Sequence, residues 1–276
     1  MAIETVDSII KALGSNFTRF VVDKSGLSNQ TAGRMVSLWR NINIPAQGVV
    51  PTTAGITTSA TLGGIPFTNQ TAPAKAYLGF ADYSTQVAGT PLIFCDRLAH
   101  QGGLVLNTTA SQTTNLPLNL ATLGVAADRI GATNFSEIQW YLEVYTDGGA
   151  TASNATINVT YDDDTTGNLN VQAVGGTLRL GNAIALNPLK PVNNKYIKGI
   201  NSIILSASTG TAGSFGFTAV RELASCSSDV SYKRENFDWA RLGFPVIPNN
   251  ACLVPMVVAL SSNSGVVKSM GKIIYG

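Results

Sequence analysis

The residues with the greatest chemical potential lie together in FCDRLAHQGGL, residues 94–104, which holds the only histidine, His100. Cys95 and Asp96 precede it, so a Cys/His or Asp/His pair for nucleophilic or acid–base catalysis can be imagined. Helical spacing would bring Asp96 near His100, but the preceding residues are typical of a strand followed by a loop. We therefore expect a loop stabilised by local hydrogen bonds and no catalytic residue.

A second candidate is the acidic run Asp162–Asp164, which with Thr166 and Gly167 partly matches a calcium-binding loop. Ala173 stands where that loop needs a bidentate carboxylate. We expect a hairpin turn and no metal site; a weak cation site completed by another chain is the alternative. Nucleotide-binding, zinc-protease and serine-nucleophile motifs are absent from the sequence, so we expect no cofactor.

Two Trp–Arg pairs are the candidate interface residues: Trp39 with Arg40, and Trp239 with Arg241. Aromatic side chains beside arginine are typical of interface anchors, but the same tryptophans could equally belong to a core. The third tryptophan, Trp140, falls on the apolar face of an expected strand and is interpreted as core.

Composition limits the function classes. Lys and Arg number 18 and Asp and Glu 16, together 12% of the chain, where an ordinary soluble domain has about 25%. The net charge of +2 provides no basic field for nucleic acid. No apolar run is long enough to span a membrane, and the N-terminus does not resemble a secretory signal. Three widely spaced cysteines, Cys95, Cys226 and Cys252, predict buried thiols.

Few helices are expected to position these residues. Thr5 can cap a short helix over residues 6–13, a second helix is predicted for 28–39, and a weak candidate spans 118–129. Residues 44–74 contain no charge and are rich in Pro, Thr, Gly and Ala. Their scattered apolar side chains predict an ordered extended arm.

The centre of the chain carries the clearest strand patterns. Residues 137–145 predict a half-buried strand, with inward Ile138, Trp140, Leu142 and Val144 and outward Gln139, Tyr141, Glu143 and Tyr145. Residues 154–161 repeat the alternation, with inward Ala155, Ile157, Val159 and Tyr161, and the turn at 162–168 predicts a hairpin. Further strands are expected at 92–95, 176–180, 200–206, 214–220, 256–260 and 266–275.

Short strands without alternating helices favour a mainly β fold: an antiparallel β-sandwich or jelly roll with short N-terminal helices and an extended arm. We predict three parts along the chain, namely an arm over 1–75, a central sandwich over 76–225 and a C-terminal extension over 226–276. A surface made mostly of Thr, Ser, Asn, Gln, Gly and Ala suits a protein that neighbours cover in a large assembly.

Five segments together resemble virion structural proteins of tailed bacteriophages, in particular head decoration (cement) proteins: residues 37–51, 92–104, 140–167, 208–223 and 238–258. The most specific of these contains a D-R-L-x-H-x-G-G-L pattern, formed here by Asp96, Arg97, Leu98, His100, Gly102, Gly103 and Leu104. We call residues 96–104 the DRLH segment.

The resemblance implies a non-enzymatic protein on the capsid surface, made in the host cytoplasm. Its implied partners are the major capsid protein and sister copies, as a homotrimer or another homo-oligomer, without membrane or direct nucleic-acid binding. We expect residues 1–75 and the C-terminal 50 to supply much of the contact. The alternatives are the major shell protein itself, as a jelly roll, or a tail-associated receptor- or carbohydrate-binding module using Tyr141 and Tyr145.

Overall fold

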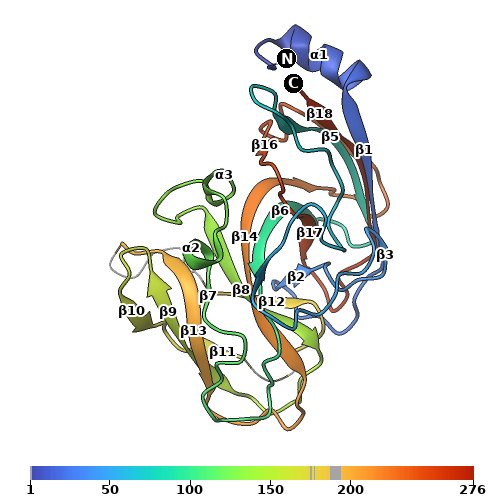
Figure 1. The fold of residues 1–276 in the computed structure, drawn as a ribbon. Coiled ribbons are helices and arrows are strands. Elements are labelled where there is room, and N and C mark those ends of the chain that lie inside the picture. Colours follow the sequence, from blue (N-terminus) through green and yellow to red (C-terminus); the bar gives the residue numbers. More distant parts are fainter. Residues whose placement is uncertain (1, 175, 177, 187–193) are drawn as a thin grey trace. The chain divides into compact units, whose positions relative to one another are not determined.

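The computed structural model describes residues 2–174, 176, 178–186 and 194–276, and it is mainly β with antiparallel strand pairs (Figure 1). The chain forms two compact units. Unit one combines residues 1–48, 58–96 and 222–276, and unit two combines residues 49–57 and 97–221. The three-part division along the sequence stays a prediction.

The helices are α1 (Val6–Ser15), α2 (Leu120–Leu123) and α3 (Ala127–Ile130). The strands are β1 (Phe17–Lys24), β2 (Met35–Ser37), β3 (Asn43–Ile44), β4 (Gly55–Ile56), β5 (Ala76–Thr85), β6 (Pro91–His100), β7 (Leu118–Asn119), β8 (Ile138–Thr146), β9 (Asn154–Tyr161), β10 (Thr166–Asn168), β11 (Gln172–Ala173), β12 (Asn182–Ala185), β13 (Ile197–Leu205), β14 (Ser214–Ser227), β15 (Glu235–Asp238), β16 (Val246–Ile247), β17 (Leu253–Val258) and β18 (Val267–Tyr275).

Helix α1 forms where its cap and apolar spacing predict it. The Thr5 hydroxyl accepts a hydrogen bond from Ser8 N (3.2 Å), and Ser8 Oγ accepts one from Thr5 N (3.0 Å). These reciprocal bonds satisfy backbone donors that the first helical turn leaves free. Ile9 and Ala12 are buried against Ile274 of β18, which attaches this short helix to a sheet.

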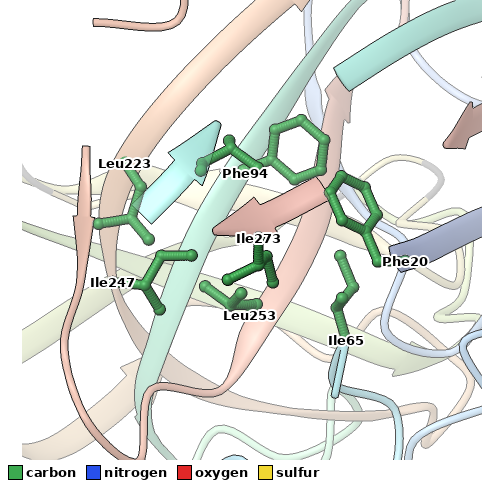
Figure 2. A pocket seen from close by; sticks show the side chains of 8 residues that line it. Phe20, Ile65, Phe94, Leu223, Ile247, Leu253 and Ile273 are labelled. Atoms are coloured by element: carbon green, nitrogen blue, oxygen red, sulfur yellow. The ribbon is translucent and has the colours of Figure 1, made fainter. Parts of the chain in front are cut away.

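Unit one is built from two groups of strands around one core. The first is a sheet in the order β15-β5-β18-β1-β3, with β16 also on β5, and the second joins β2 and β6 to β17. Buried side chains of both groups meet, for example Phe20 and Phe94, whose rings lie edge to face at 5.7 Å. Eight such side chains line a void of about 10 Å³ (Figure 2). Its lining is apolar, so the void has no polar group to hold a ligand.

Unit two holds the second core. One sheet has the order β10-β9-β13-β7, with β11 on β9, and β8 lies between β14 and β12. Strand β9 follows its predicted alternation, with Ala155, Ile157, Val159 and Tyr161 buried. Trp140 is fully buried, and its indole N–H donates to Ile197 O at 2.8 Å, so its interpretation as core is confirmed.

The helix predicted for 28–39 is wrong. Residues 35–37 instead form β2, in which Val36 and Ser37 pair with Val257 and Met256 of β17. This pairing buries Val36 completely, and it outweighs the weak helical spacing of a short segment. The weak helix at 118–129 is reduced to the single-turn helices α2 and α3, because Gly124, with φ 76°, ends α2 in the left-handed conformation.

Three strand predictions need correction. The strand expected at 92–95 continues to His100, so half of the expected loop is strand. Strand β8 is buried on both faces, including Tyr141, Glu143 and Tyr145. The strand expected at 176–180 is wrong: residues 176 and 178–180 are not in a strand, 177 lies outside the described residues, and the next strand, β12, begins at Asn182. The remaining predicted strands, at 200–206, 214–220, 256–260 and 266–275, are confirmed as β13, β14, β17 and β18.

A buried lysine fixes the end of β1. Lys24 is fully buried, and its Nζ donates to Asn41 O at 3.0 Å and to Pro45 O at 2.5 Å, which ties β1 to the start of the extended arm. Burial lowers the pKa of Lys24 to about 8, because the charged ammonium loses its hydration.

This pKa predicts how stability depends on pH. Between about pH 8 and the ordinary lysine value of 10.5 the unfolded chain holds a proton that the folded chain has lost, so raising the pH through this window stabilises the folded protein. Relative to Lys24→Met, the wild type should gain roughly 2 kcal/mol of unfolding free energy between pH 7 and pH 10 in urea titrations. The exposed Lys75→Met is the control. A stability difference between wild type and Lys24→Met that is flat over this range would contradict the assignment.

Candidate functional site

The DRLH segment lies on the last part of β6 and the turn that follows, and its side chains are taken up by the fold. Asp96 Oδ1 accepts a hydrogen bond from Cys252 N at 2.8 Å within unit one. Leu98 and Leu104 are fully buried in the core of unit two. The imagined Asp96–His100 pair does not form, because residues four apart in a strand are separated by about 13 Å.

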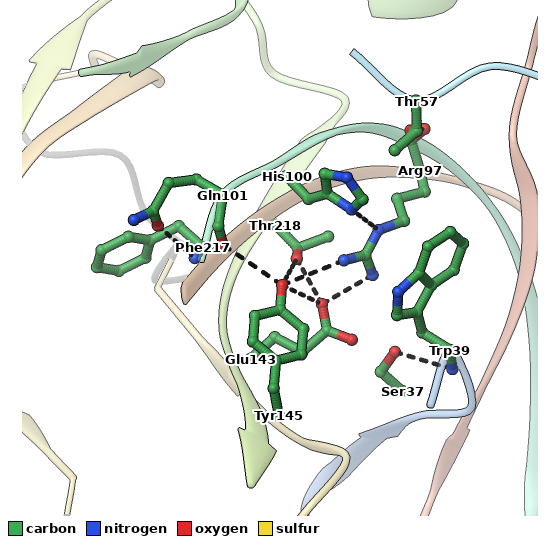
Figure 3. A network of polar contacts seen from close by, with 10 residues as sticks. All are labelled: Ser37, Trp39, Thr57, Arg97, His100, Gln101, Glu143, Tyr145, Phe217 and Thr218. Atoms are coloured by element: carbon green, nitrogen blue, oxygen red, sulfur yellow. Dashed lines mark hydrogen bonds and ion pairs between the residues drawn. The ribbon is translucent and has the colours of Figure 1, made fainter. Parts of the chain in front are cut away.

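Arg97 is the centre of a buried polar network in unit two (Figure 3). Its Nη1 lies 2.7 Å from Glu143 Oε2, in an ion pair whose side chains are 1% and 2% exposed. Its Nη2 donates to Tyr145 OH at 3.3 Å, and its Nε donates to His100 Nδ1 at 3.1 Å. Thr218 Oγ1 donates to the same Glu143 oxygen at 2.5 Å. The network therefore links β6, β8 and β14 through side chains.

A second buried arginine supports the backbone of the first. Arg129 Nη2 donates to Arg97 O at 3.0 Å, and Arg129 Nη1 donates to Thr57 O at 2.7 Å. The Thr57 hydroxyl also donates to Arg97 O. Helix α3 and the segment following β4 are thus held to the end of β6 by one side chain.

The two glycines of the segment permit close backbone approach. A Cβ on Gly102 would lie 2.4 Å from Pro51 O, and Gly103 has a φ of 93°, which side chains rarely tolerate. On the facing strand β14, a Cβ on Gly216 would lie 1.7 Å from Gln101 O. Gln101 then pairs with Phe217 through backbone bonds in both directions, at 2.9 and 3.1 Å.

The protonation states within the network suit structure rather than proton transfer. Burial, helped by the Arg97 charge, lowers the pKa of His100 to about 2, so the imidazole is neutral and accepts at Nδ1. Burial raises the pKa of Tyr145, and the neighbouring Glu143 charge adds to this. Burial also raises the pKa of Cys95, so this thiol stays protonated and is a poor nucleophile.

The acidic run at 162–164 is neutralised by lysines. Asp163 pairs with Lys195, Asp164 pairs with Lys198, and Asp162 Oδ1 accepts a hydrogen bond from Tyr196 N. The hydrogen bond from Lys195 lowers the pKa of Asp163 to about 2. The described residues hold no group of three or more His, Cys, Asp or Glu side chains arranged for a metal ion. Strand β10 pairs with β9 across this turn, which confirms the predicted hairpin.

The candidate interface residues lie in four different environments of unit one. Trp39 is 1% exposed, so its ring belongs to the interior. Its neighbour Arg40 is half-buried and donates to Gly48 O. Trp239 is half-buried, edge to face with Phe244 at 6.1 Å.

Arg241 is the most accessible of the four candidates. Its guanidinium lies 4.2 Å above the Phe237 ring and donates to Asn236 O at 2.6 Å. An interface role for Arg40, Trp239 and Arg241 stays a prediction. The three cysteines are free and buried, as their spacing predicts.

Sequence reasoning missed Glu143, Thr218 and Arg129 as members of the network. One signal was available for Glu143, the one carboxylate in the interior of the otherwise largely apolar strand at residues 138–146. A charged side chain within a buried strand requires a charged partner. The position of that partner, Arg97, depends on strand pairing and not on spacing along the chain.

The network predicts a strong dependence on its central ion pair. Replacing Glu143 with Leu leaves the Arg97 cation buried without a counter-charge and should cost about 3–5 kcal/mol of unfolding free energy in urea titrations. The double variant Arg97→Met/Glu143→Leu should recover part of this loss. Arg179→Met, which removes the exposed ion pair with Asp147, is the control and should cost less than about 1 kcal/mol. Equal losses for Glu143→Leu and Arg179→Met would refute the role of the network.

Comparison with known proteins yields similarity to solved structures alone. No protein-family model matches the chain, and no curated protein matches it. The chain is similar to the structure of infectious bursal disease virus Gx strain, with 11% identity over 95% of this chain and 82% of that chain, at a TM-score of 0.24. It is also similar to the crystal structure of the infectious bursal disease virus VP2 subviral particle, with 12% identity over 94% and 81% of the two chains, at a TM-score of 0.18.

Proposed function

We propose that the chain is a non-enzymatic structural protein of a bacteriophage virion, which binds and stabilises the capsid lattice as a decoration protein. It acts on the capsid surface, with the major capsid protein and sister copies as partners. The proposal rests on the sequence resemblance to cement proteins and on the use that the fold makes of the most specific resembling segment.

The observation that carries the proposal is the buried network around Arg97. The DRLH segment has the residue types of an active site, yet Arg97 and His100 direct their polar atoms to one another and to Glu143 and Tyr145. A segment used in this way stabilises the protein that contains it. Mechanical stability is what a protein needs when it holds a lattice against outward pressure.

The surface gives a second line of support. Fourteen large apolar side chains of the described residues are at least 40% exposed, in a chain with only 12% charged residues. They lie mainly in unit one and along the arm, including Ile42, Ile44, Val49 and Leu62. Exposed apolar side chains at this density are typical of surfaces that meet other proteins.

The alternatives differ in what the structure offers them. Tyr141 and Tyr145, the tyrosines considered for stacking on sugars, are 7% and 1% exposed and cannot present their rings to a glycan. The mainly β architecture suits a jelly-roll shell protein as well as a decoration protein. Assembly behaviour therefore separates these two functions.

The expected contact regions cannot be tested by deleting residues 1–45, because this stretch contains core strands of unit one. Residues 1–45 contain β1 and β2, which are paired with β18 and β17 in the core of unit one. Removing this stretch would destroy unit one together with any contact surface. Binding must be tested with the full chain and with substitutions of exposed side chains.

The deciding experiment mixes the purified chain with heads from the same phage that lack it, followed by light scattering and negative-stain imaging. We expect a discrete small oligomer that binds the heads and saturates at a fixed number of copies. Closed shells formed by this chain alone would identify it as the shell protein instead. A small oligomer that leaves the heads bare would refute the decoration role and favour the tail.

A further inference from the structure

One face of the sheet in unit one is left open at its centre. On this outer face Val21 of β1 lies directly opposite Met270 of β18, and the two side chains are 40% and 41% exposed. Ile44 of β3, opposite Asp23, extends the row and is 53% exposed. Val21 and Met270 thus form an exposed apolar pair on this face, and Ile44 lies diagonally from Val21, beside Asp23.

Helix α1 covers only one end of this face. It packs through Ile9 and Ala12 on Ile274, and Lys272 Nζ donates to its Leu13 O at 2.7 Å. On the free side of the helix, Val6 and Ile10 are 55% and 59% exposed, one helical turn apart. We call Val6, Ile10, Val21, Ile44 and Met270 the outer apolar face.

The strand beside this face also has an unpaired edge. Strand β3 pairs only with Asp23 and Lys24, so within the described chain the edge of β1 from residue 17 to residue 22 has no neighbouring strand. An apolar face next to an open strand edge favours association, because a second chain buries the apolar side chains and can pair with the free backbone groups of the edge.

Charge divides the surroundings of the face into two halves. On the helix side, Glu4, Asp7 and Lys11 are exposed, so among residues 2–15 the carboxylates outnumber the cation. On the strand side, Arg19, Lys268 and Lys272 stand against Asp23, which lies 3.7 Å from Lys268, so that side is basic.

Two further carboxylates lie on the strand side: Asp238 of β15, opposite Phe80, is exposed and offsets one of the cations, and Asp82 is already paired. Asp82 of β5, next to Met270, accepts a hydrogen bond from Met270 N and lies 3.4 Å from Arg234 Nε. The strand side therefore keeps a net positive charge and the helix side a net negative one. Arg19 and Lys272, directly opposite each other, lie between α1 and the Val21–Met270 pair, so the face has an acidic end at the helix and a basic sheet beside it. Such a face is complementary to a second copy of itself that runs in the opposite direction.

We propose that the outer apolar face is the interface between copies of this chain, with the α1 side of one copy on the β1/β18 side of another. This inference deepens the proposed function by assigning the surface through which sister copies meet. It concerns self-association alone and is tested on the purified chain without capsids. Its failure would say nothing about the binding of heads, which the experiment with undecorated heads tests separately.

The apolar part of the interface is tested with Val21→Asp/Met270→Asp in the full chain. These two substitutions place two carboxylates in the centre of the face. They should weaken the self-association constant, measured by sedimentation and light scattering, by about tenfold or more. Val171→Asp, at a residue of unit two that is 59% exposed, is the matched control and should leave association unchanged. Thermal melting verifies that each variant is folded.

The charge arrangement is tested by exchange between two variants. Glu4→Lys/Asp7→Lys makes the helix side basic, and Arg19→Glu/Lys268→Glu makes the strand side acidic, so each variant alone should associate more weakly. Mixing them brings a basic helix side onto an acidic strand side and should restore association. A monomeric wild type at all concentrations, or a mixture no better than either variant alone, would overturn the proposal.

Discussion

Unit two depends on one constraint: the buried guanidinium of Arg97 must have a counter-charge and hydrogen-bond acceptors. Glu143, Tyr145 and His100 meet that need from β8 and from β6 itself, and Thr218 of β14 shares the same carboxylate oxygen. Glu143 and Tyr145 reach Arg97 from another strand, so these contacts depend on how β6 and β8 are aligned. Leaving any of the partners unpaired in the interior costs more than a typical neutral hydrogen bond contributes. The ion pair therefore adds to the alignment that the buried apolar faces of these strands already favour.

The sequence predicts the parts of this fold that depend on local periodicity. Strand β9 alternates because only one of its faces is buried, and α1 has both a cap and a helical stripe. Periodicity does not predict the burial of strand β8, because both of its faces are covered. Its polar residues Glu143 and Tyr145 are buried and hydrogen-bonded to each other. Residues 35–37 become a strand through pairing with β17, over 200 residues away, which no local pattern reveals.

The candidate site shows the same limit in chemical terms. A His, an Asp, an Arg and a Cys within six residues look like a catalytic set, but a strand directs neighbouring side chains to opposite faces. Burial then leaves the imidazole neutral and the thiol protonated. The residue types were visible in the sequence, whereas their environment came from strands β8 and β14, far along the chain. The exposure of Val21 and Met270 likewise depends on which face of a sheet remains uncovered.

The pairing of β1 with β18 also sets the order in which the protein can mature. Residues 17–24 align with residues 267–274, so β1 has no partner along this edge until β18 has been synthesised. Unit one therefore cannot close before β18 has left the ribosome, and Val21 and Met270 come together on its outer face only then. A chain interrupted before β18 would leave residues 17–22 of β1 unpaired on both edges. The folding of unit one is thus coupled to the synthesis of a strand more than 200 residues after the one it completes.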